Sequence, residues 1–333
     1  WTAGTIMAWV KIEYGTSGTL PNLYSIAGQE NMRLFITRAR TPAFSVITQD
    51  QVTSGSNFPG NNIQVQPDPL LNIELQNELW YHVTGVFNSA DQTVKLYLNG
   101  ELIGSETDAQ LNSELITKNF NGSAHIYSTR NFTIGRYPTN TSAAGSGHFN
   151  GNIDEVRVFD SALTEDQIQQ MVYQEIENNG GFVKGKVIPK DIQDLPTSQK
   201  VSWTNLKGYY PMTDIIGCDT SDESSNTNKL TLHNITTVQE QTAPMPYESK
   251  ANGDWSSSAT WLYGDVWDIA SESTNKDWSI VNIKHNVTTS NSHTNLGLII
   301  DSNQTLEING DNKVENTNYL ELNGVLDLED DSQ

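Results

Sequence analysis

Residues 80–106 read "WYHVTGVFNSADQTVKLYLNGELIGSE", and they contain apolar runs on both sides of a polar turn. The runs "WYHVTGVFN" and "TVKLYLN" are rich in aromatic and β-branched residues, which favour strands. The second run ends at Asn99-Gly100, and an Asn-Gly pair is the strongest short-range signal for a hairpin turn. The stretch therefore predicts consecutive antiparallel strands.

Similar short runs lie on both sides of this stretch. They read "TIMAWVKIE" (5–13), "MRLFITR" (32–38), "AFSVITQ" (43–49), "FTIGRY" (132–137) and "NIDEVRVF" (152–159). Short strands at regular spacing with turns between them are typical of an antiparallel sandwich. We therefore predict a sandwich over the first half of the chain.

One helix is expected after the last of these strands. Thr164 and Gln167 have the spacing of a capping box. An apolar stripe at helical spacing follows, made of Ile168, Met171, Val172 and Ile176. The sequence "NNGG" at 178–181 predicts the end of this helix, because glycine is favoured just after a helix C-terminus.

The remaining sequence divides into two parts. Residues 179–250 contain several prolines and predict a connector. Residues 251–333 contain short apolar runs separated by Asn, Gly or Asp, at the near-regular pitch of stacked rungs in a parallel β-helix. The sequence thus predicts an all-β protein with a sandwich and its C-terminal helix at 1–178, a connector at 179–250, and the cap and first rungs of a β-helix at 251–333.

The charge of the chain restricts its partners. The formal net charge is -21, with 40 acidic and 19 basic residues, which disfavours nucleic acid and anionic lipid as partners. We expect no membrane insertion, because no apolar run is long enough to span a bilayer. Cys218 is the single cysteine, so a disulfide within the chain is excluded. This composition fits a bacterial exterior protein and offers many oxygen ligands for Ca²⁺.

Three segments together resemble the laminin-G-like, concanavalin A-type jelly-roll family. They are residues 80–106, "FTIGRY" (132–137) and "FNGNIDEVRVFDSALTEDQIQQM" (149–171). The resemblance covers roughly residues 1–178 and implies a jelly-roll sandwich. The opening strand usual in the family is missing, and "LKGYYPM…DESSNTNKLTLHN" (206–234) is similar to it. That segment either pairs back onto the sandwich or begins a second module.

The three-part arrangement resembles very large surface proteins of Bacteroidota, some of which are gliding adhesins. The resemblance implies an extracellular or cell-surface bacterial location, a role in adhesion, and contact with the type 9 secretion machinery during export. The chain starts at Trp1 and stops shortly after a strand-like run. We therefore expect it to be an interior piece of a longer protein.

Asp154 and Glu155 are adjacent in a predicted strand, so their side chains should point to opposite faces. Glycosidases need two carboxyl groups roughly 5–9.5 Å apart across one bond, which disfavours catalysis by this pair. If Val156 faces the core, Asp154 shares its face and either accepts backbone N–H bonds or binds Ca²⁺. Glu155 and Arg157 are expected to form a surface pair that contributes little.

Two further sets of residues are candidate ligand sites. The acidic loop "DTSDESSNTN" is either solvated or a second Ca²⁺ site, so the candidate metal ligands are Asp154, Asp219 and Asp222. Aromatic rings offer flat apolar faces for stacking on sugars. The candidates for this role are Tyr127, Tyr137 and Phe149.

The chain has no recognisable catalytic motif, so we predict that it is not an enzyme. The first hypothesis is a surface module that acts in adhesion by binding a glycan or a surface protein. The second is an accessory carbohydrate-binding region of a secreted polysaccharide-degrading enzyme. The third is a structural spacer that binds no ligand.

Overall fold

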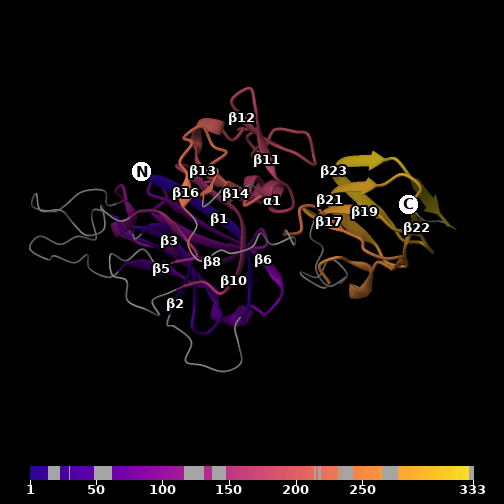
Figure 1. Cartoon of the computed structure of the whole chain (residues 1–333), viewed down its shortest axis with the longest axis horizontal. Helices are drawn as coiled ribbons and strands as arrows, with labels where there is room; N and C mark the ends of the chain where they lie inside the picture. Colours follow the sequence, from indigo (N-terminus) through magenta and orange to yellow (C-terminus); the bar gives the residue numbers. More distant parts are fainter. Residues whose placement is uncertain are drawn as a thin grey trace, which may run out of the picture. The chain divides into compact units, whose positions relative to one another are not determined.

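The chain folds into two compact units, each built from two separate stretches of sequence (Figure 1). A computed structural model describes residues 1–13, 23–29, 31–48, 62–115, 131–136, 148–213, 215–216, 219–231, 233, 243–264 and 277–329. Unit 1 comprises Trp1–Glu165 and Val201–Gln241, and unit 2 comprises Asp166–Lys200 and Thr242–Gln333. These boundaries differ from the predicted contiguous parts, because the chain leaves unit 1 at Glu165 and returns to it at Val201.

The first sheet of unit 1 has six antiparallel strands. In spatial order they are β13 (Leu206–Tyr210), β10 (Gly151–Phe159), β1 (Ala3–Ile12), β6 (Trp80–Asn88), β7 (Thr93–Leu98) and β8 (Glu101–Thr107). Leu98 pairs with Glu101, and the two residues between them, Asn99 and Gly100, have φ angles of 52° and 88°. The predicted Asn-Gly hairpin turn is therefore confirmed.

The second sheet of unit 1 has five strands. Their spatial order is β5 (Ile63–Val65), β4 (Pro42–Val46), β3 (Met32–Thr37), β2 (Leu23–Gln29) and β9 (Thr133–Ile134). All of its pairings are antiparallel. The antiparallel sheets expected of a jelly-roll sandwich are therefore present.

The hydrophobic core lies between these sheets. Ile6 and Val10 of β1 belong to the same buried cluster as Leu34 of β3 and Phe44 of β4. The Phe44 ring occupies the space beside Gly85, where an added Cβ would lie 2.2 Å from a ring carbon. Glycine at this position therefore lets the ring approach the backbone of β6.

Strand β13 settles which of two interpretations applies to the segment around residue 206. It pairs with β10 in antiparallel register, with Tyr210 opposite Val156 and Tyr209 opposite Arg157. The segment thus pairs back onto the sandwich as the edge strand of the first sheet. A small three-stranded sheet follows, made of β14 (Ile215–Ile216), β15 (Asp219–Thr220) and β16 (Leu230–Thr231).

The helix is shorter than predicted. Helix α1 spans Glu165–Val172, and the chain then forms a hairpin of β11 (Ile176–Asn179) and β12 (Phe182–Gly185). Gly180 and Gly181 have φ angles of 58° and 94° and make the turn of this hairpin. The prediction that "NNGG" ends the helix was wrong, because two residues with positive φ also form the two-residue turn that hairpins prefer.

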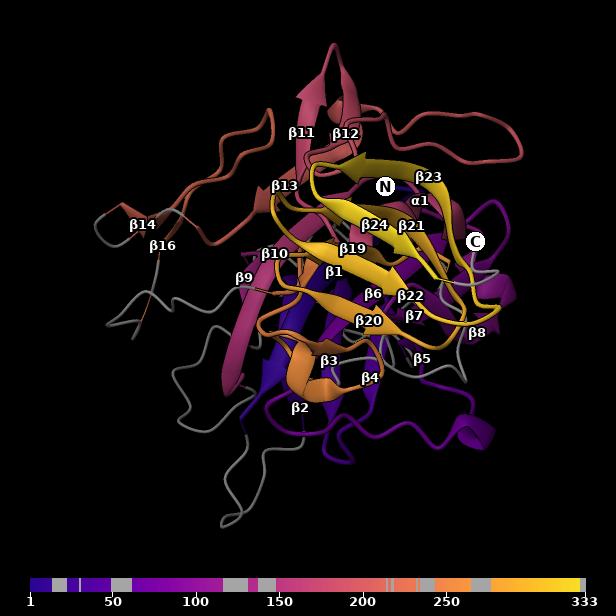
Figure 2. The same ribbon diagram turned by 90° about the vertical axis from the view of Figure 1, so that its right-hand side faces the viewer.

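Unit 2 contains two parallel sheets whose strands alternate along the chain (Figure 2). One has the order β17 (Tyr247–Glu248), β19 (Ile280–Ile283), β21 (His293–Ile300) and β23 (Val314–Leu322). The other has the order β18 (Gly253–Asp254), β20 (Val287–Thr289), β22 (Thr305–Ile308) and β24 (Val325–Leu328). Apolar residues stand in register, with Leu306 opposite both Val287 and Leu326.

A cluster of aromatic rings lies at the start of these parallel sheets. Trp255 and Trp261 are both buried, and their rings meet edge to face with centroids 5.1 Å apart. The Trp261 indole N–H donates a hydrogen bond of 2.8 Å to the carbonyl oxygen of Trp255. Tyr247 packs against Trp261 at 5.3 Å. The tryptophan-rich stretch thus forms a small core of its own.

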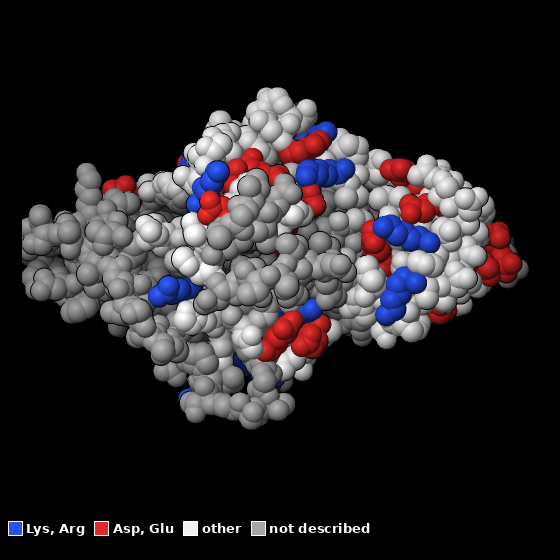
Figure 3. Space-filling view, viewed as in Figure 1, with Lys and Arg blue, Asp and Glu red and all other residues white. Residues whose placement is uncertain are grey.

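The part of the chain that the structure describes also contains four short 3₁₀ turns. They are η2 (Pro69–Leu71), η3 (Ala109–Leu111), η5 (Trp203–Asn205) and η6 (Ser258–Thr260). Among the residues that the structure describes, no helix has the length and apolar character needed to cross a membrane. Most basic side chains on the face drawn in Figure 3 lie next to acidic ones. Lys284 and Glu248 of unit 2 form a salt bridge of 2.6 Å.

Candidate functional site

A β-bulge in β10 changes the directions of the two acidic side chains singled out in the sequence. Met7 pairs with Arg157, but Trp9 pairs with Asp154, so β10 carries one extra residue here. Glu155 has a φ angle of 52°, which is the left-handed region. Directly opposed residues share a face, so Asp154 lies on the face of Trp9 and not on that of Val156. The expectation that Asp154 shares the core face was therefore wrong.

Glu155 and Arg157 form a buried ion pair. Their side chains are each only 1% exposed. The Arg157 Nε donates to Glu155 Oε2 at 3.1 Å, and Arg157 Nη2 donates to the same oxygen. The Tyr209 hydroxyl, from the returning strand β13, lies 3.1 Å from both carboxylate oxygens. The predicted surface pair exists, but the prediction that it is exposed was wrong.

His82 lies on the same face of the first sheet. Its ring meets that of Trp9 edge to face with centroids 5.4 Å apart. Burial, with the positive charge of Arg157 nearby, holds the pKa of His82 well below 6.5. The imidazole is therefore neutral near pH 7, and it belongs to the packed interior of this face.

Asp222 accepts hydrogen bonds that hold the edge strand β13 in place. Its Oδ1 accepts hydrogen bonds of 2.9 Å from the backbone N–H groups of Tyr209 and Ser224, and its Oδ2 accepts one of 3.0 Å from that of Asn228. The backbone N–H of Glu223 also donates to the Tyr209 carbonyl oxygen at 2.8 Å. The acidic loop therefore covers the outer edge of β13, which would otherwise present unpaired backbone groups.

The structure does not bring the three candidate metal ligands together as a cluster. Asp154 Oδ1 accepts from the backbone N–H of Glu155 at 3.0 Å, Asp222 binds backbone N–H groups, and Asp219 lies in β15. Within the described ranges, no three His, Cys, Asp or Glu side chains are grouped so that they could hold a metal ion. Asp154 therefore makes the backbone bond of its first alternative, and Asp222 is buried and bonds backbone N–H groups, which neither alternative for the acidic loop included.

The structure describes only one of the three aromatic residues predicted to stack on sugars. Tyr127 and Tyr137 lie outside the described residues. Phe149 is half-buried and packs against the sandwich core. Its backbone N–H donates to the Gly135 carbonyl oxygen at 2.8 Å. Phe149 therefore contributes to packing at the start of β10.

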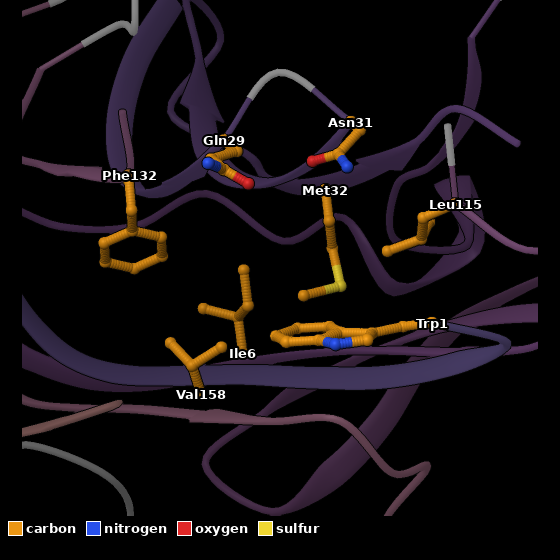
Figure 4. A pocket seen from close by; sticks show the side chains of 8 residues that line it. All are labelled: Trp1, Ile6, Gln29, Asn31, Met32, Leu115, Phe132 and Val158. Carbon is orange, nitrogen blue, oxygen red and sulfur yellow. The ribbon is translucent and has the colours of Figure 1, made fainter. Parts of the chain in front are cut away.

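A cavity of about 250 Å³ opens between the two sheets of unit 1 (Figure 4). Four of its lining residues retain exposure and form its rim, namely Trp1, Gln29, Asn31 and Phe132. Four others are buried and form its floor, namely Ile6, Met32, Leu115 and Val158. Trp1 is 41% exposed, so its indole is the most open aromatic surface of the cavity.

The backbone holds the rim in place. The N–H of Leu115 donates to the Trp1 carbonyl oxygen at 2.8 Å, and the N–H of Ile47 donates to the Asn31 carbonyl oxygen at 2.9 Å. The Phe132 ring stacks on the ring of Tyr210, which comes from β13. Figure 4 shows the Met32 side chain reaching from the side of Gln29 and Asn31 toward the Trp1 indole. The cavity is therefore built by segments far apart in the sequence.

The first half of the chain is similar to a known protein family. Residues 2–169 match the Laminin_G_3 family model, described as the Concanavalin A-like lectin/glucanases superfamily. The chain belongs to this superfamily. The match covers most of unit 1, and it confirms the family resemblance inferred from residues 80–106, 132–137 and 149–171. No curated protein sequence matches the chain.

Several solved structures are similar to this superfamily member at low sequence identity. One is a protein from Bacteroides ovatus ATCC 8483 named as a candidate carbohydrate-binding protein, with 18% identity, a TM-score of 0.41, and coverage of 72% of this chain and 56% of that one. This chain thus spans little more than half of that protein. Another is a heptameric SAP-like pentraxin from Limulus polyphemus, with 18% identity, a TM-score of 0.33, and coverage of 51% and 70%.

A third similar structure is the CBM40 of the Ruminococcus gnavus IT-sialidase bound to α2,3-sialyllactose. Its identity is 19%, its TM-score is 0.33, and the match covers 50% of this chain and 80% of that one.

Sequence reasoning did not find the cavity of this Concanavalin A-like unit. Of its rim, only Phe132 lay in a stretch recognised as a strand, and neither Gln29 nor Asn31 belongs to a motif. The cavity depends on where β1, β10 and the β2–β3 hairpin meet. A partly exposed tryptophan next to a predicted strand was the one local signal, at Trp1.

Proposed function

We propose that unit 1 is a non-enzymatic module that binds a glycan at the cavity between its sheets. The observation that carries this proposal is the rim of Trp1, Phe132, Gln29 and Asn31, in a domain of a superfamily that includes lectins. Aromatic rings pack on the apolar faces of sugar rings, and an amide side chain has two donor and two acceptor positions for hydroxyl groups. The rim thus combines the two kinds of group that a sugar requires.

The size of the cavity limits what can enter. Ligand pockets commonly measure about 300–1,000 Å³. At about 250 Å³, this cavity suits one sugar residue and not a whole oligosaccharide. The proposed ligand is therefore the terminal residue of a glycan chain, with the rest of the chain in solvent.

The rest of the chain is assigned a supporting role. We propose that the two alternating parallel sheets of unit 2 are coils of a β-helix, which the in-register pairs Val287–Leu306 and Leu306–Leu326 support. We propose a location at the bacterial exterior, with which the acidic composition and single cysteine are compatible. The three-part arrangement, similar to that of large surface proteins, is the basis for proposing that the chain is part of an adhesin exported by type 9 secretion. In this arrangement unit 2 displays unit 1.

A glycan array probed with the whole 333-residue chain tests the proposed function. The expected result is binding to a set of glycans that share one terminal residue, and weaker binding by Gln29→Trp, which fills the rim. Leu70→Trp is the matched control, because Leu70 is 91% exposed, is in unit 1 and does not line the cavity. Binding to no glycan, or equal binding by both variants, would overturn the proposal.

A further inference from the structure

The floor of the cavity offers almost no hydrogen-bonding group to a ligand. Its side chains are Ile6, Met32, Leu115 and Val158, and each is at most 6% exposed. The Met32 thioether sulfur is only a weak acceptor, and the other three side chains are hydrocarbon. The backbone N–H of Leu115 already donates to the Trp1 carbonyl oxygen. A sugar hydroxyl that reached this floor would lose its hydrogen bonds to water without replacement.

The two side-chain amides of the cavity lie together on one side. Figure 4 shows the amide side chains of Gln29 and Asn31 on one side of the space and Trp1, Ile6 and Val158 on the other, with the Met32 side chain reaching between them. A ligand in this space meets amides on one side and, apart from the Trp1 indole N–H, carbon and sulfur on the other. Its hydroxyl-bearing part therefore fits the rim, and its apolar part fits the floor.

The position of Met32 shows how closely the floor is packed. A Cβ added to Gly4 would lie 2.8 Å from the Met32 sulfur, so the thioether lies directly over the backbone of β1. Met32 cannot withdraw in that direction, so it does not make room for a large substituent. The room above the floor therefore suits a compact substituent.

We infer that the cavity receives a sugar through a methyl group, as in the C6 methyl of a 6-deoxyhexose or the acetyl methyl of an N-acetylhexosamine. This inference rests on the proposed function and specifies its ligand. The methyl group lies on Ile6 and Val158, and burial of a methyl group there is favourable because it leaves water. The ring hydroxyls remain beside Gln29 and Asn31.

Two pairs of sugars distinguish a C6 methyl group from an acetyl methyl group as the part that binds. L-Fucose and L-galactose differ only at C6, which is a methyl group in the first and a hydroxymethyl group in the second. N-Acetylglucosamine and glucosamine differ by the acetyl group. Calorimetric titration of the whole chain should show at least tenfold tighter binding of the methyl-bearing member in at least one pair. The pair that shows it identifies the source.

Val158→Thr is the decisive variant, because threonine has nearly the shape of valine but places a hydroxyl group in the floor. It should reduce the preference for the methyl-bearing sugar several-fold. Gln29→Trp serves if Val158→Thr fails to fold, and it should weaken binding of both members. Leu102→Thr, at a 39% exposed position on β8, is the control and should keep the preference.

The outcomes distinguish this inference from the function on which it rests. Glycan binding with equal affinity for both members of each pair would overturn the inference and leave the function standing. A methyl preference that Val158→Thr does not change would also overturn it. The absence of binding to any glycan would overturn both.

Discussion

The ring of Tyr210 stacks on the ring of Phe132, with centroids 6.4 Å apart and planes 20° apart. Tyr210 lies on β13, which rejoins unit 1 only after the chain has passed through residues 166–200 of unit 2. Phe132 is part of the cavity rim. The returning strand therefore completes the first sheet and also supports one wall of the proposed binding site.

Removal of the Tyr210 ring should damage both the sandwich and the site. Tyr210 is 4% exposed, and truncation of a large buried aromatic side chain costs about 3–5 kcal/mol. We expect Tyr210→Ala to lower the denaturant midpoint of unit 1 and to weaken glycan binding. Tyr210→Phe keeps the ring and should bind as the wild type does. If Tyr210→Ala bound glycan normally, the stack would not support the site.

The buried Glu155–Arg157 pair should matter far more than an exposed pair of the same spacing. Glu155→Gln leaves Arg157 buried without a compensating charge, which costs about 3–5 kcal/mol when a buried pair is broken. Lys313 and Glu315 form the matched exposed pair, with side chains 58% and 54% exposed. Glu315→Gln should change the free energy of unfolding by less than about 1 kcal/mol. Similar losses in urea titrations of the two variants would contradict this account.

His293 should make unit 2 less stable in mild acid. Burial lowers its pKa to about 4, despite the opposing effect of Asp254, against 6.5 in the unfolded chain. Between these values the unfolded chain binds a proton that the folded chain does not, so stability falls as the pH drops from 6.5 toward 4. The slope is about 1.4 kcal/mol per pH unit for one such group.

Thermal melts of the wild type and of His293→Gln between pH 7 and 4 measure this effect. Glutamine can still contact Thr289, which lies 2.8 Å from the His293 Nε2, but it does not titrate. The melting temperature of the wild type should therefore fall relative to that of His293→Gln as the pH drops. A constant difference across this range would show that His293 does not titrate as described.

Asp222 should stabilise the sandwich with or without calcium. Asp222→Ala removes the acceptor of three backbone N–H groups, and each buried donor left without a partner costs about 1–3 kcal/mol. We expect the same fall in melting temperature in Ca²⁺ and in a chelator. A melting temperature that Ca²⁺ raises in the wild type but not in Asp222→Ala would instead make this carboxylate a calcium ligand.

Local signals predicted much of unit 1. The aromatic and β-branched runs in residues 80–106 and the Asn99-Gly100 turn needed no information from distant parts of the chain, and the structure confirms the hairpin there. The "NNGG" sequence shows the limit of such signals. Its two glycines fit both a helix end and a hairpin turn, and pairing between Ile176 and Gly185 decides between them.

The acidic residues of β10 could not be placed by alternation alone. A single bulge at Glu155 places the Asp154 side chain on the opposite face of the sheet from the one predicted. No residue type at that position indicates a bulge. The burial of Arg157 could not be predicted either, because the Tyr209 hydroxyl that completes its network comes from a strand 54 residues after Glu155. The cavity could not be predicted for the same reason, since its walls meet only in the folded sandwich.

The most direct test of the glycan-binding site is an NMR titration of the whole chain with the glycan that the array selects. The Trp1 indole N–H resonance, assigned by comparison with Trp1→Phe, is the reporter. The account predicts that this resonance and the side-chain amide resonances of Gln29 and Asn31 shift together and saturate at one affinity. Saturable shifts confined to other residues, with these three unmoved, would contradict it.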